Sequence, residues 1–258
     1  MSNSQSDSLV RKCKTGQSAS PPLWPELQER CQLPELMDDP SLDDDLHYGA
    51  LNGLRRINIL SRSDAILWPT LRSLSRELNR PLKILDVASG GGDLVVALSK
   101  RAKASDLNWK IDGCDISDRA LEYAERFSRQ HSPLTNSFIQ CDVLQDGVPI
   151  GYDIVMCSLF LHHLGRDEAV VFLRHMREAC GISLLINDLR RTRFGYLLAR
   201  VGARLLTRSP IVHIDGPLSV RAAWSDNEVR QLAAEADIND PAITHCWPQR
   251  FLLSWRKP

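Results

Sequence analysis

The sequence lacks the features that identify several large classes of protein. No uncharged run approaches the roughly 20 residues that a membrane-spanning helix needs. The polar residues 1–20 have no apolar core of the kind found in a secretory signal peptide. Basic and acidic residues balance at 32 each, so the net charge indicates no polyanionic partner such as nucleic acid. We therefore expect a cytoplasmic protein without a membrane span.

Paired cysteines are also missing. The seven cysteines form no Cys-x-x-Cys pair, their number is odd, and several lie inside apolar runs. This usage is typical of buried, reduced thiols and not of disulfides or zinc ligands. The sequence thus predicts a reducing compartment and no metal site.

What is present is an alternation of apolar runs with helical patterns from residue 81 onward, which is typical of βαβ units. Strands are expected at residues 83–87, 109–115, 137–141, 152–158, 181–186, 242–247 and 250–255. Helices are expected at residues 63–80, 94–104, 118–130 and 167–179. The prediction is an α/β protein with a Rossmann-like, doubly wound sheet of about seven strands, mostly parallel, with an antiparallel C-terminal hairpin.

The remaining segments are assigned by composition and pattern. Residues 1–20 are expected to be a disordered tail and residues 21–80 a helical cap at the edge of the fold, with Ser63 as a helix N-cap. Residues 81–258 form the main domain, which carries a helical insertion at about 189–224.

The most informative stretch is residues 84–93, where an apolar run ends in Asp86 and is followed by a glycine-rich turn and a helix. A turn without Cβ atoms lets a ligand approach the backbone at the helix N-terminus. The dinucleotide fingerprint needs a third small residue, but counting from Gly90 that position is Val95. Because Asp86 and Asp93 repel phosphate, the turn favours a cationic ligand.

Residues 86–92 read Asp-x-Ala-x-Gly-x-Gly, which resembles the acidic-x-Gly-x-Gly-x-Gly first motif of class I S-adenosylmethionine (SAM)-dependent methyltransferases. Ala88 stands where that motif has its first glycine, and Gly90 and Gly92 match the other two. In that family the turn wraps the amino-acid end of SAM, whose sulfonium is cationic. The resemblance covers about residues 81–188 and implies a small-molecule methyltransferase whose helical cap covers the active site.

Acids follow the next two strands in sequence order. An acid that ends the second strand can accept both ribose hydroxyls, and Asp115 is preferred because Asp112 lies earlier in the strand and is expected to face outward. The resemblance places Asp142 at the exocyclic amine of adenine. Each acid has a simpler alternative role as the cap of the next helix. The other expected cofactor contacts are Ile116, Val143 and Ser158.

Histidines are the candidate catalytic residues. His162 and His163 lie in a Leu-Phe-Leu-His-His-Leu phrase that is often seen in small-molecule methyltransferases, and an imidazole suits a general base near neutral pH. Adjacent helix residues do not face the same way, so at most one, with His163 preferred, is expected to face the site. The alternative is a pair of helix-start residues satisfied by hydrogen bonds. His213 is a further candidate, in an apolar run that ends in a turn.

Acceptor contacts are expected at the carboxyl end of the fifth strand, where open sheets bind ligands. Asn187, Asp188 and Arg190 occupy that place. His47 and Tyr48 lie on a helix of the cap and are further candidates, although a solvated helix face is the favoured interpretation for each.

A basic amphipathic helix is expected within residues 190–208. Arginines 193, 200, 204 and 208 lie on one side, and the adjoining side carries Phe194, Leu198, Val201 and Leu205. Such a helix either packs its apolar side on the core or rests on a membrane surface and steers an anionic or lipid-like substrate.

These features predict transfer of a methyl group from SAM to oxygen, or to carbon, of a phenol, quinone or polyketide-like compound. The chain lacks the Asn-Pro-Pro-aromatic phrase of methyltransferases that act on exocyclic or amide nitrogens. N-methylation of a small amine remains an alternative. A nicotinamide-dependent oxidoreductase and a non-catalytic SAM-binding protein are the alternatives outside this class.

Overall fold

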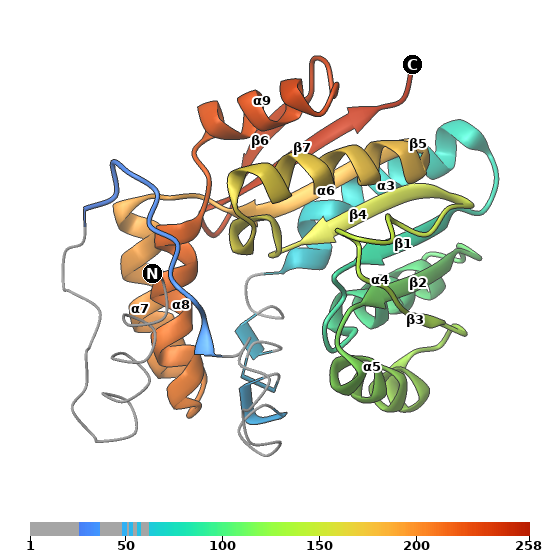
Figure 1. The fold of residues 1–258 in the computed structure, drawn as a ribbon. Helices are drawn as coiled ribbons and strands as arrows, with labels where there is room; N and C mark the ends of the chain where they lie inside the picture. Colours follow the sequence, from blue (N-terminus) through green and yellow to red (C-terminus); the bar gives the residue numbers. More distant parts are fainter. Residues whose placement is uncertain (1–25, 37–47, 51, 54–55, 58–61) are drawn as a thin grey trace.

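The computed structural model describes residues 26–36, 48–50, 52–53, 56–57 and 62–258, and its centre is one seven-stranded sheet (Figure 1). The strand order is β3-β2-β1-β4-β5-β7-β6. β1 to β5 pair in parallel, and β7 runs antiparallel between β5 and β6. The strands are β1 (Lys83–Val87), β2 (Lys110–Asp115), β3 (Phe138–Gln140), β4 (Tyr152–Ser158), β5 (Cys180–Leu189), β6 (Ala242–Cys246) and β7 (Arg250–Arg256). The predicted sheet and its antiparallel C-terminal hairpin are confirmed.

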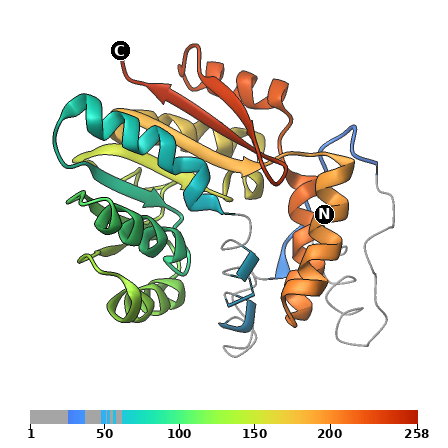
Figure 2. The ribbon, with the colours of Figure 1, turned by 180° about the vertical axis from the view of Figure 1, so that it is seen from behind.

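Helices cover both faces of this sheet (Figures 1 and 2). They are α3 (Ser63–Leu78), α4 (Asp93–Ala104), α5 (Asp118–His131), α6 (Arg166–Ala179), α7 (Arg193–Leu206), α8 (Pro210–Ala222) and α9 (Asp226–Glu235), with a short 3-10 turn, η2 (Leu161–His163). Side chains of β1 alternate between two cores: Ile84 packs with α3 and α4, whereas Leu85 packs with α6 and α9. This alternation follows from the two-residue period of a strand.

α3 differs from its prediction. Its N-cap is Arg62, in a left-handed conformation, and Ser63 is a buried residue of the first turn whose hydroxyl accepts a hydrogen bond from Arg250. Leu67 and Leu71 are fully buried in the core that also contains β1 and α4. α3 therefore covers a face of the sheet and is not a cap over the carboxyl ends of the strands. Packing on the sheet buries the apolar side of the helix.

α7 and α8 form a helical pair beyond the end of β5, beside the described N-terminal segment (Figure 1). The run at residues 211–217 was predicted to end in a turn, but it lies inside α8 despite Pro217. Ile211 and Val212 are buried against Ala203 of α7, so tertiary packing outweighs the local turn signal. Within the described ranges, no helix combines the length and apolarity needed to cross a membrane.

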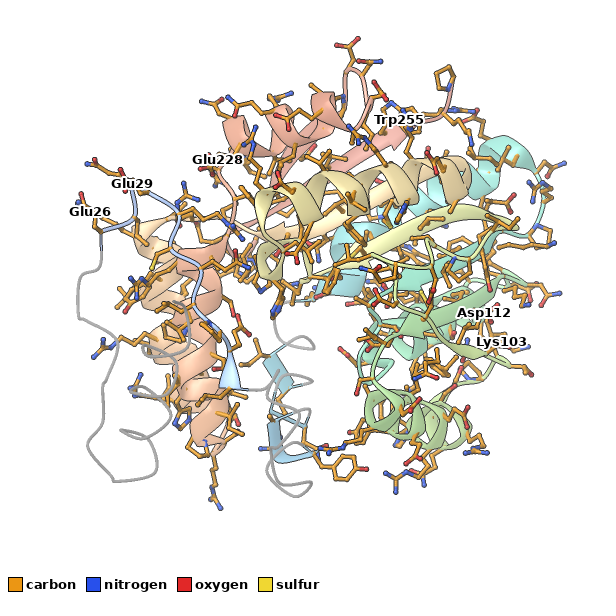
Figure 3. All side chains as sticks on the ribbon, in the orientation of Figure 1. Glu26, Glu29, Lys103, Asp112, Glu228 and Trp255 are labelled. Carbon is orange, nitrogen blue, oxygen red and sulfur yellow. The ribbon has the colours of Figure 1, made fainter. Side chains whose placement is uncertain are left out.

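Asp112, labelled in Figure 3, was predicted to face outward. That prediction is wrong, because its side chain is fully buried. Its Oδ1 accepts a hydrogen bond of 2.9 Å from the Ser137 backbone, and its Oδ2 accepts one of 2.9 Å from the Tyr152 hydroxyl. Buried acids of this kind are tolerated only when they are paired. Asp112 thus ties β2 to the segment before β3 and to β4.

Replacing Asp112 with leucine is expected to lower the free energy of unfolding by about 1–3 kcal/mol, because the Ser137 N–H and the Tyr152 hydroxyl lose their acceptor and Lys110 loses its ion pair. Urea unfolding followed by circular dichroism measures this change. Glu122→Gln, at an exposed position of α5, is the matched control and should leave the free energy of unfolding within about 0.5 kcal/mol of the parent. An equally small effect of Asp112→Leu would contradict the assigned role.

Candidate active site

The glycine turn after β1 and the end of β2 are held together by a carboxylate. Asp115 Oδ2 accepts a hydrogen bond of 2.8 Å from the Gly90 backbone N–H, and Asp115 Oδ1 accepts one of 3.0 Å from Ser117 N–H. These bonds place the carboxylate between the turn and the end of β2, where open sheets bind ligands. The predicted ribose contact is therefore compatible with the geometry of Asp115.

The turn itself adopts left-handed backbone conformations, with φ of 50° at Gly90 and 71° at Gly92. A Cβ on Gly92 would lie 2.9 Å from the Phe138 ring, so glycine is required there for space as well as for conformation. Ala88 also has a positive φ, of 55°, at the place where the resembling motif has glycine. Alanine at this position costs about 1–2 kcal/mol of backbone strain.

Buried polar atoms without partners lie beneath this turn. Among the described residues, Asp86 Oδ1 and Ser89 Oγ are buried and accept or donate no hydrogen bond. Burial raises the pKa of Asp86 well above its usual range, and the nearby carboxylates of Asp93 and Asp115 raise it further. A cation with hydrogen-bond donors would satisfy the carboxylate and offset this repulsion. The residues present therefore fit the sulfonium and amino groups of SAM, and they do not fit a pyrophosphate.

The other expected cofactor contacts differ in how they are placed. Asp142 Oδ1 accepts hydrogen bonds from the backbone N–H groups of Leu144 and Gln145, at 3.0 and 3.3 Å, and so caps a turn, as in its simpler alternative. Ile116 is 62% exposed beside Asp115, whereas Val143 is buried in the core. An adenine contact by Asp142, Ile116 or Val143 stays a prediction.

Ser158 and Asn187 are neighbours at the ends of β4 and β5. The Asn187 amide donates a hydrogen bond of 2.8 Å to the Ser158 hydroxyl, and Asn187 Oδ1 is buried without a hydrogen-bond partner in the described part of the chain. The next residue after β4, Leu159, has a φ of 60°, which is strained for a leucine. An unpaired buried oxygen beside strained backbone is typical of a ligand-binding edge.

Asp188 orients His162. The carboxylate accepts a hydrogen bond of 3.0 Å from the His162 backbone N–H through Oδ2, and its Oδ1 lies 2.7 Å from His162 Nδ1. Burial alone would raise the pKa of Asp188, but attraction to the imidazole and the hydrogen bonds outweigh it, and the pKa is lowered. An ionised Asp188 holds the proton of the imidazole on Nδ1 and directs Nε2 away from β5.

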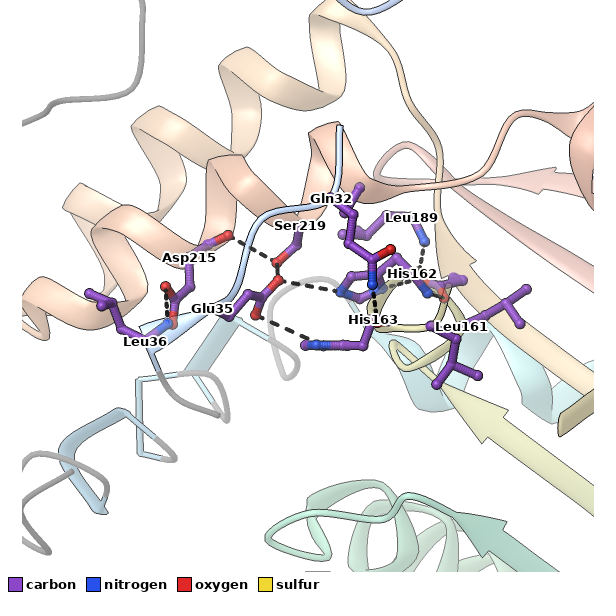
Figure 4. Close-up of polar contacts among 12 residues, drawn as sticks. Gln32, Glu35, Leu36, Leu161, His162, His163, Leu189, Asp215 and Ser219 are labelled. Atoms are coloured by element: carbon purple, nitrogen blue, oxygen red, sulfur yellow. Dashed lines mark hydrogen bonds and ion pairs between the residues drawn. The ribbon is translucent and has the colours of Figure 1, made fainter. Parts of the chain in front are cut away.

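The sequence did not predict Glu35, which faces both histidines (Figure 4). Its Oε1 lies 3.9 Å from His162 Nε2, and its Oε2 lies 3.9 Å from His163 Nε2. Because η2 is a 3-10 turn and not an α-helix, both imidazoles face Glu35, while a catalytic role for either histidine stays a prediction. A cavity of about 310 Å³ opens here, lined by Gln32, Leu33, Pro34, Glu35, His162, His163 and Ala222.

The remaining candidates lie outside this cluster. His213 Nε2 contacts the Thr207 carbonyl at 2.8 Å and links α8 to the end of α7. Tyr48 stacks on Tyr123 of α5, and Arg190 lies 3.8 Å from the Asp226 carboxylate. His47 lies outside the described residues. Acceptor binding by Tyr48 and Arg190 stays a prediction.

Comparisons with known proteins agree with this architecture. Residues 84–181 match a family described as "Methyltransferase domain". The chain is 36% identical over 128 residues to a ubiquinone biosynthesis O-methyltransferase from Methylococcus capsulatus, with 49% of this chain and 51% of that protein covered. The corresponding protein from Leptothrix cholodnii is 26% identical over 129 residues, with 49% and 52% covered. The chain thus spans about half the length of these curated relatives.

Solved structures extend the likeness over most of the chain. Magnesium protoporphyrin IX methyltransferase from Synechocystis PCC 6803 with bound SAM has a TM-score of 0.53 and 15% identity, over 85% of this chain and all 100% of that chain. Plantazolicin methyltransferase in complex with S-adenosylhomocysteine (SAH) has a TM-score of 0.59 and 15% identity, over 85% and 90% of the two chains. At these identities the likeness shows a shared fold.

The raised pKa of Asp86 predicts a pH dependence of cofactor binding. Only the ionised carboxylate attracts a sulfonium, so SAM affinity should fall by up to about tenfold for each pH unit below that raised pKa. Isothermal titration calorimetry at a series of pH values measures this, with NAD as a ligand that should not bind. Asp86→Asn should weaken SAM binding and flatten its pH profile, while Asp118→Asn, at the start of α5, should change neither. Parallel pH profiles for Asp86→Asn and the parent would contradict this role.

Proposed function

We propose that this chain, which contains a class I SAM-dependent methyltransferase domain, methylates a hydroxyl group of a small phenol or quinol. The observation that carries the proposal is the placement of two groups of residues at the same edge of the sheet. The glycine turn, which is hydrogen-bonded to Asp115, fits a cationic, hydroxylated cofactor. The imidazole of His162, held by Asp188, follows the adjacent strand β4. Cofactor and acceptor sites of a methyltransferase need this adjacency.

SAM supplies an electrophilic methyl group, whose bond to sulfur breaks as the bond to the acceptor oxygen forms, leaving SAH. The chain's own residues position the acceptor and stabilise the loss of its hydroxyl proton. Asp188 orients His162, and His162, His163 and Glu35 face the cavity where an acceptor hydroxyl would enter. This cluster is the part of the site suited to stabilising loss of that proton, since a phenol ionises only near a pKa of about 10 in water.

The acceptor class rests on three observations. The matched relatives are named ubiquinone biosynthesis O-methyltransferases. Residues 84–181, which match the methyltransferase family, include the glycine turn and both histidines of η2. The cavity of about 310 Å³ has the size of a small-molecule site. A histidine and carboxylate cluster suits an ionisable hydroxyl better than a small amine. O-methylation is therefore favoured over C-methylation, and both over N-methylation.

The competing classes fit the site less well. A nicotinamide cofactor would bring a pyrophosphate to a turn that carries Asp86 and Asp93. A protein that only binds SAM has no need of an imidazole held by a buried carboxylate beside a cavity.

The surface of α7 supports contact with a membrane surface. Of the predicted apolar side, Phe194, Val201 and Leu205 are 46% to 78% exposed, and the neighbouring Leu197 is 41% exposed. This exposure favours the membrane-surface alternative over packing on the core. Instead, α7 buries Gly195, Tyr196 and Ala203. Residues 193–206 include three arginines and no acid, which complements anionic lipid headgroups. We propose that residues 190–208 rest on the cytoplasmic surface of an anionic bilayer. There the enzyme would bind a lipophilic quinol that is dissolved in the membrane.

The proposed reaction predicts methyl transfer from labelled SAM to a catechol or hydroquinone probe. Asp188→Asn should lower kcat by about 10-fold or more, because the imidazole loses its orientation, while the Kd for SAM stays unchanged. Glu122→Gln, at an exposed position of α5, is the matched control and should keep kcat. Labelled product with an amine probe but with no phenol or quinol would contradict O-methylation.

The membrane contact predicts flotation of the full chain with vesicles that contain anionic lipid, and weaker flotation with purely zwitterionic vesicles. Leu205→Glu should reduce bound protein by about tenfold or more, through lost apolar burial and added repulsion. Ile150→Glu alters an 82% exposed residue away from α7 and is the control, which should float like the parent. Equal flotation of both variants would exclude α7 as the contact.

A further inference from the structure

Three side chains with possible metal-ligand atoms face one another at the cavity. Glu35 lies in the described N-terminal segment, and His162 and His163 form the end of η2 (Figure 4). One ligand atom from each, a carboxylate oxygen or an imidazole nitrogen, lies within 4.8 Å of the other two. The sequence predicted no metal site, because Glu35 is remote in the chain from the adjacent His162 and His163 and the three residues form no ligand motif.

The separations are those of ligands around an ion and not those of hydrogen bonds. Both contacts between Glu35 and the imidazoles measure 3.9 Å, which is beyond the range of a hydrogen bond. Two nitrogen or oxygen ligands at 2.0–2.2 Å from one tetrahedral Zn²⁺ are about 3.4 Å apart. The two contacts join different oxygens of the Glu35 carboxylate, and the three candidate ligand atoms lie within 4.8 Å of one another, so their separations must shorten by up to about 1.4 Å to reach this spacing.

The ligand groups of His162 and Glu35 are held by second hydrogen-bonding partners, as metal ligands usually are, and the backbone of His163 is held as well. His162 contacts Asp188 through Nδ1 at 2.7 Å, which leaves Nε2 as the ligand atom. The Ser219 hydroxyl donates a hydrogen bond of 2.6 Å to Glu35 Oε1, and Gln32 donates one of 2.5 Å to the backbone carbonyl of His163. The carboxylate–histidine arrangement of Asp188 and His162 is the pattern that raises the basicity of a ligating imidazole.

The N-terminal segment is fixed by several contacts, so the position of Glu35 is a property of the fold. Arg30 donates hydrogen bonds to the carbonyls of His162 and Leu164 at 2.8 and 2.7 Å, and its guanidinium lies 3.7 Å from the centre of the Trp224 ring. Leu36 N–H donates to Asp215 Oδ1 at 2.9 Å. Glu35 is thereby held between two anchors, one on η2 and the other on α8.

We propose that Glu35, His162 and His163 bind a divalent transition-metal cation of the Zn²⁺ type. Two imidazoles and one carboxylate are a ligand set that leaves coordination positions open, and the adjoining cavity gives a small oxygen ligand access to them. A metal-bound phenolic hydroxyl loses its proton more readily, which is the catalytic use that the ion would have. That use rests on the proposed function, whereas binding of the ion does not.

The experiment titrates the chelator-treated full chain with Zn²⁺ by isothermal titration calorimetry, and with Co²⁺ by visible absorption, in the absence of SAM and acceptor. We expect one saturable site and a Co²⁺ absorption band. Glu35→Gln and His163→Gln should each weaken the Kd for Zn²⁺ by at least about 10-fold, and Asp188→Asn by about 10–100-fold. The Kd for SAM should stay unchanged in Glu35→Gln and His163→Gln, which shows that these variants are folded.

Matched controls are Glu29→Gln, at an exposed position of the same N-terminal segment, and His131→Gln, at an exposed position of α5. Both should bind Zn²⁺ like the parent. Absence of saturable Zn²⁺ and Co²⁺ binding, or an equal Kd in the ligand variants and the controls, would overturn the site. A chain that binds Zn²⁺ through these residues but methylates no phenol or quinol would support the metal site and contradict the proposed acceptor.

Discussion

The common direction of β1, β2, β4 and β5 is the constraint on which the rest of the site depends. Val87 at the end of β1 lies beside Cys114 of β2 and Cys157 of β4, and Ser158 lies beside Asn187 of β5. Parallel strands in this register release their following loops at one edge of the sheet. The cofactor turn and the histidine turn η2 therefore meet there although they are remote in sequence.

The two parts of this edge have different electrostatic demands. Around the glycine turn, Asp86, Asp93 and Asp115 place negative charges close together, and a cationic ligand would reduce their repulsion. Burial and this repulsion together raise the pKa of Asp86. At β5, the charge of Asp188 is satisfied within the protein by His162, so the pKa of this equally buried acid is lowered. Burial alone therefore does not decide the protonation state of an acid; its partners do.

Segments outside the sheet form part of the cavity wall. Residues 26–36 and the α7–α8 pair form one wall, joined by the contacts of Arg30, Leu36 and Ser219. This wall carries Glu35 on its inner side and the exposed apolar residues of α7 on its outer side. A small-molecule site and a candidate lipid-contacting surface are thus parts of the same structural unit, beyond the matched residues 84–181.

The sequence alone determined the sheet, its hairpin and the location of the glycine turn after β1, because strand periodicity, glycine content and acids at strand ends are local signals. Only the tertiary structure decided which polar groups meet. Asp112 is buried because Tyr152 reaches it from another strand, and Glu35 joins the histidines through contacts between distant segments. The apolar side of α7 is exposed because α8 covers its other side. Such pairings depend on how elements pack, and residue spacing along the chain carries no record of it.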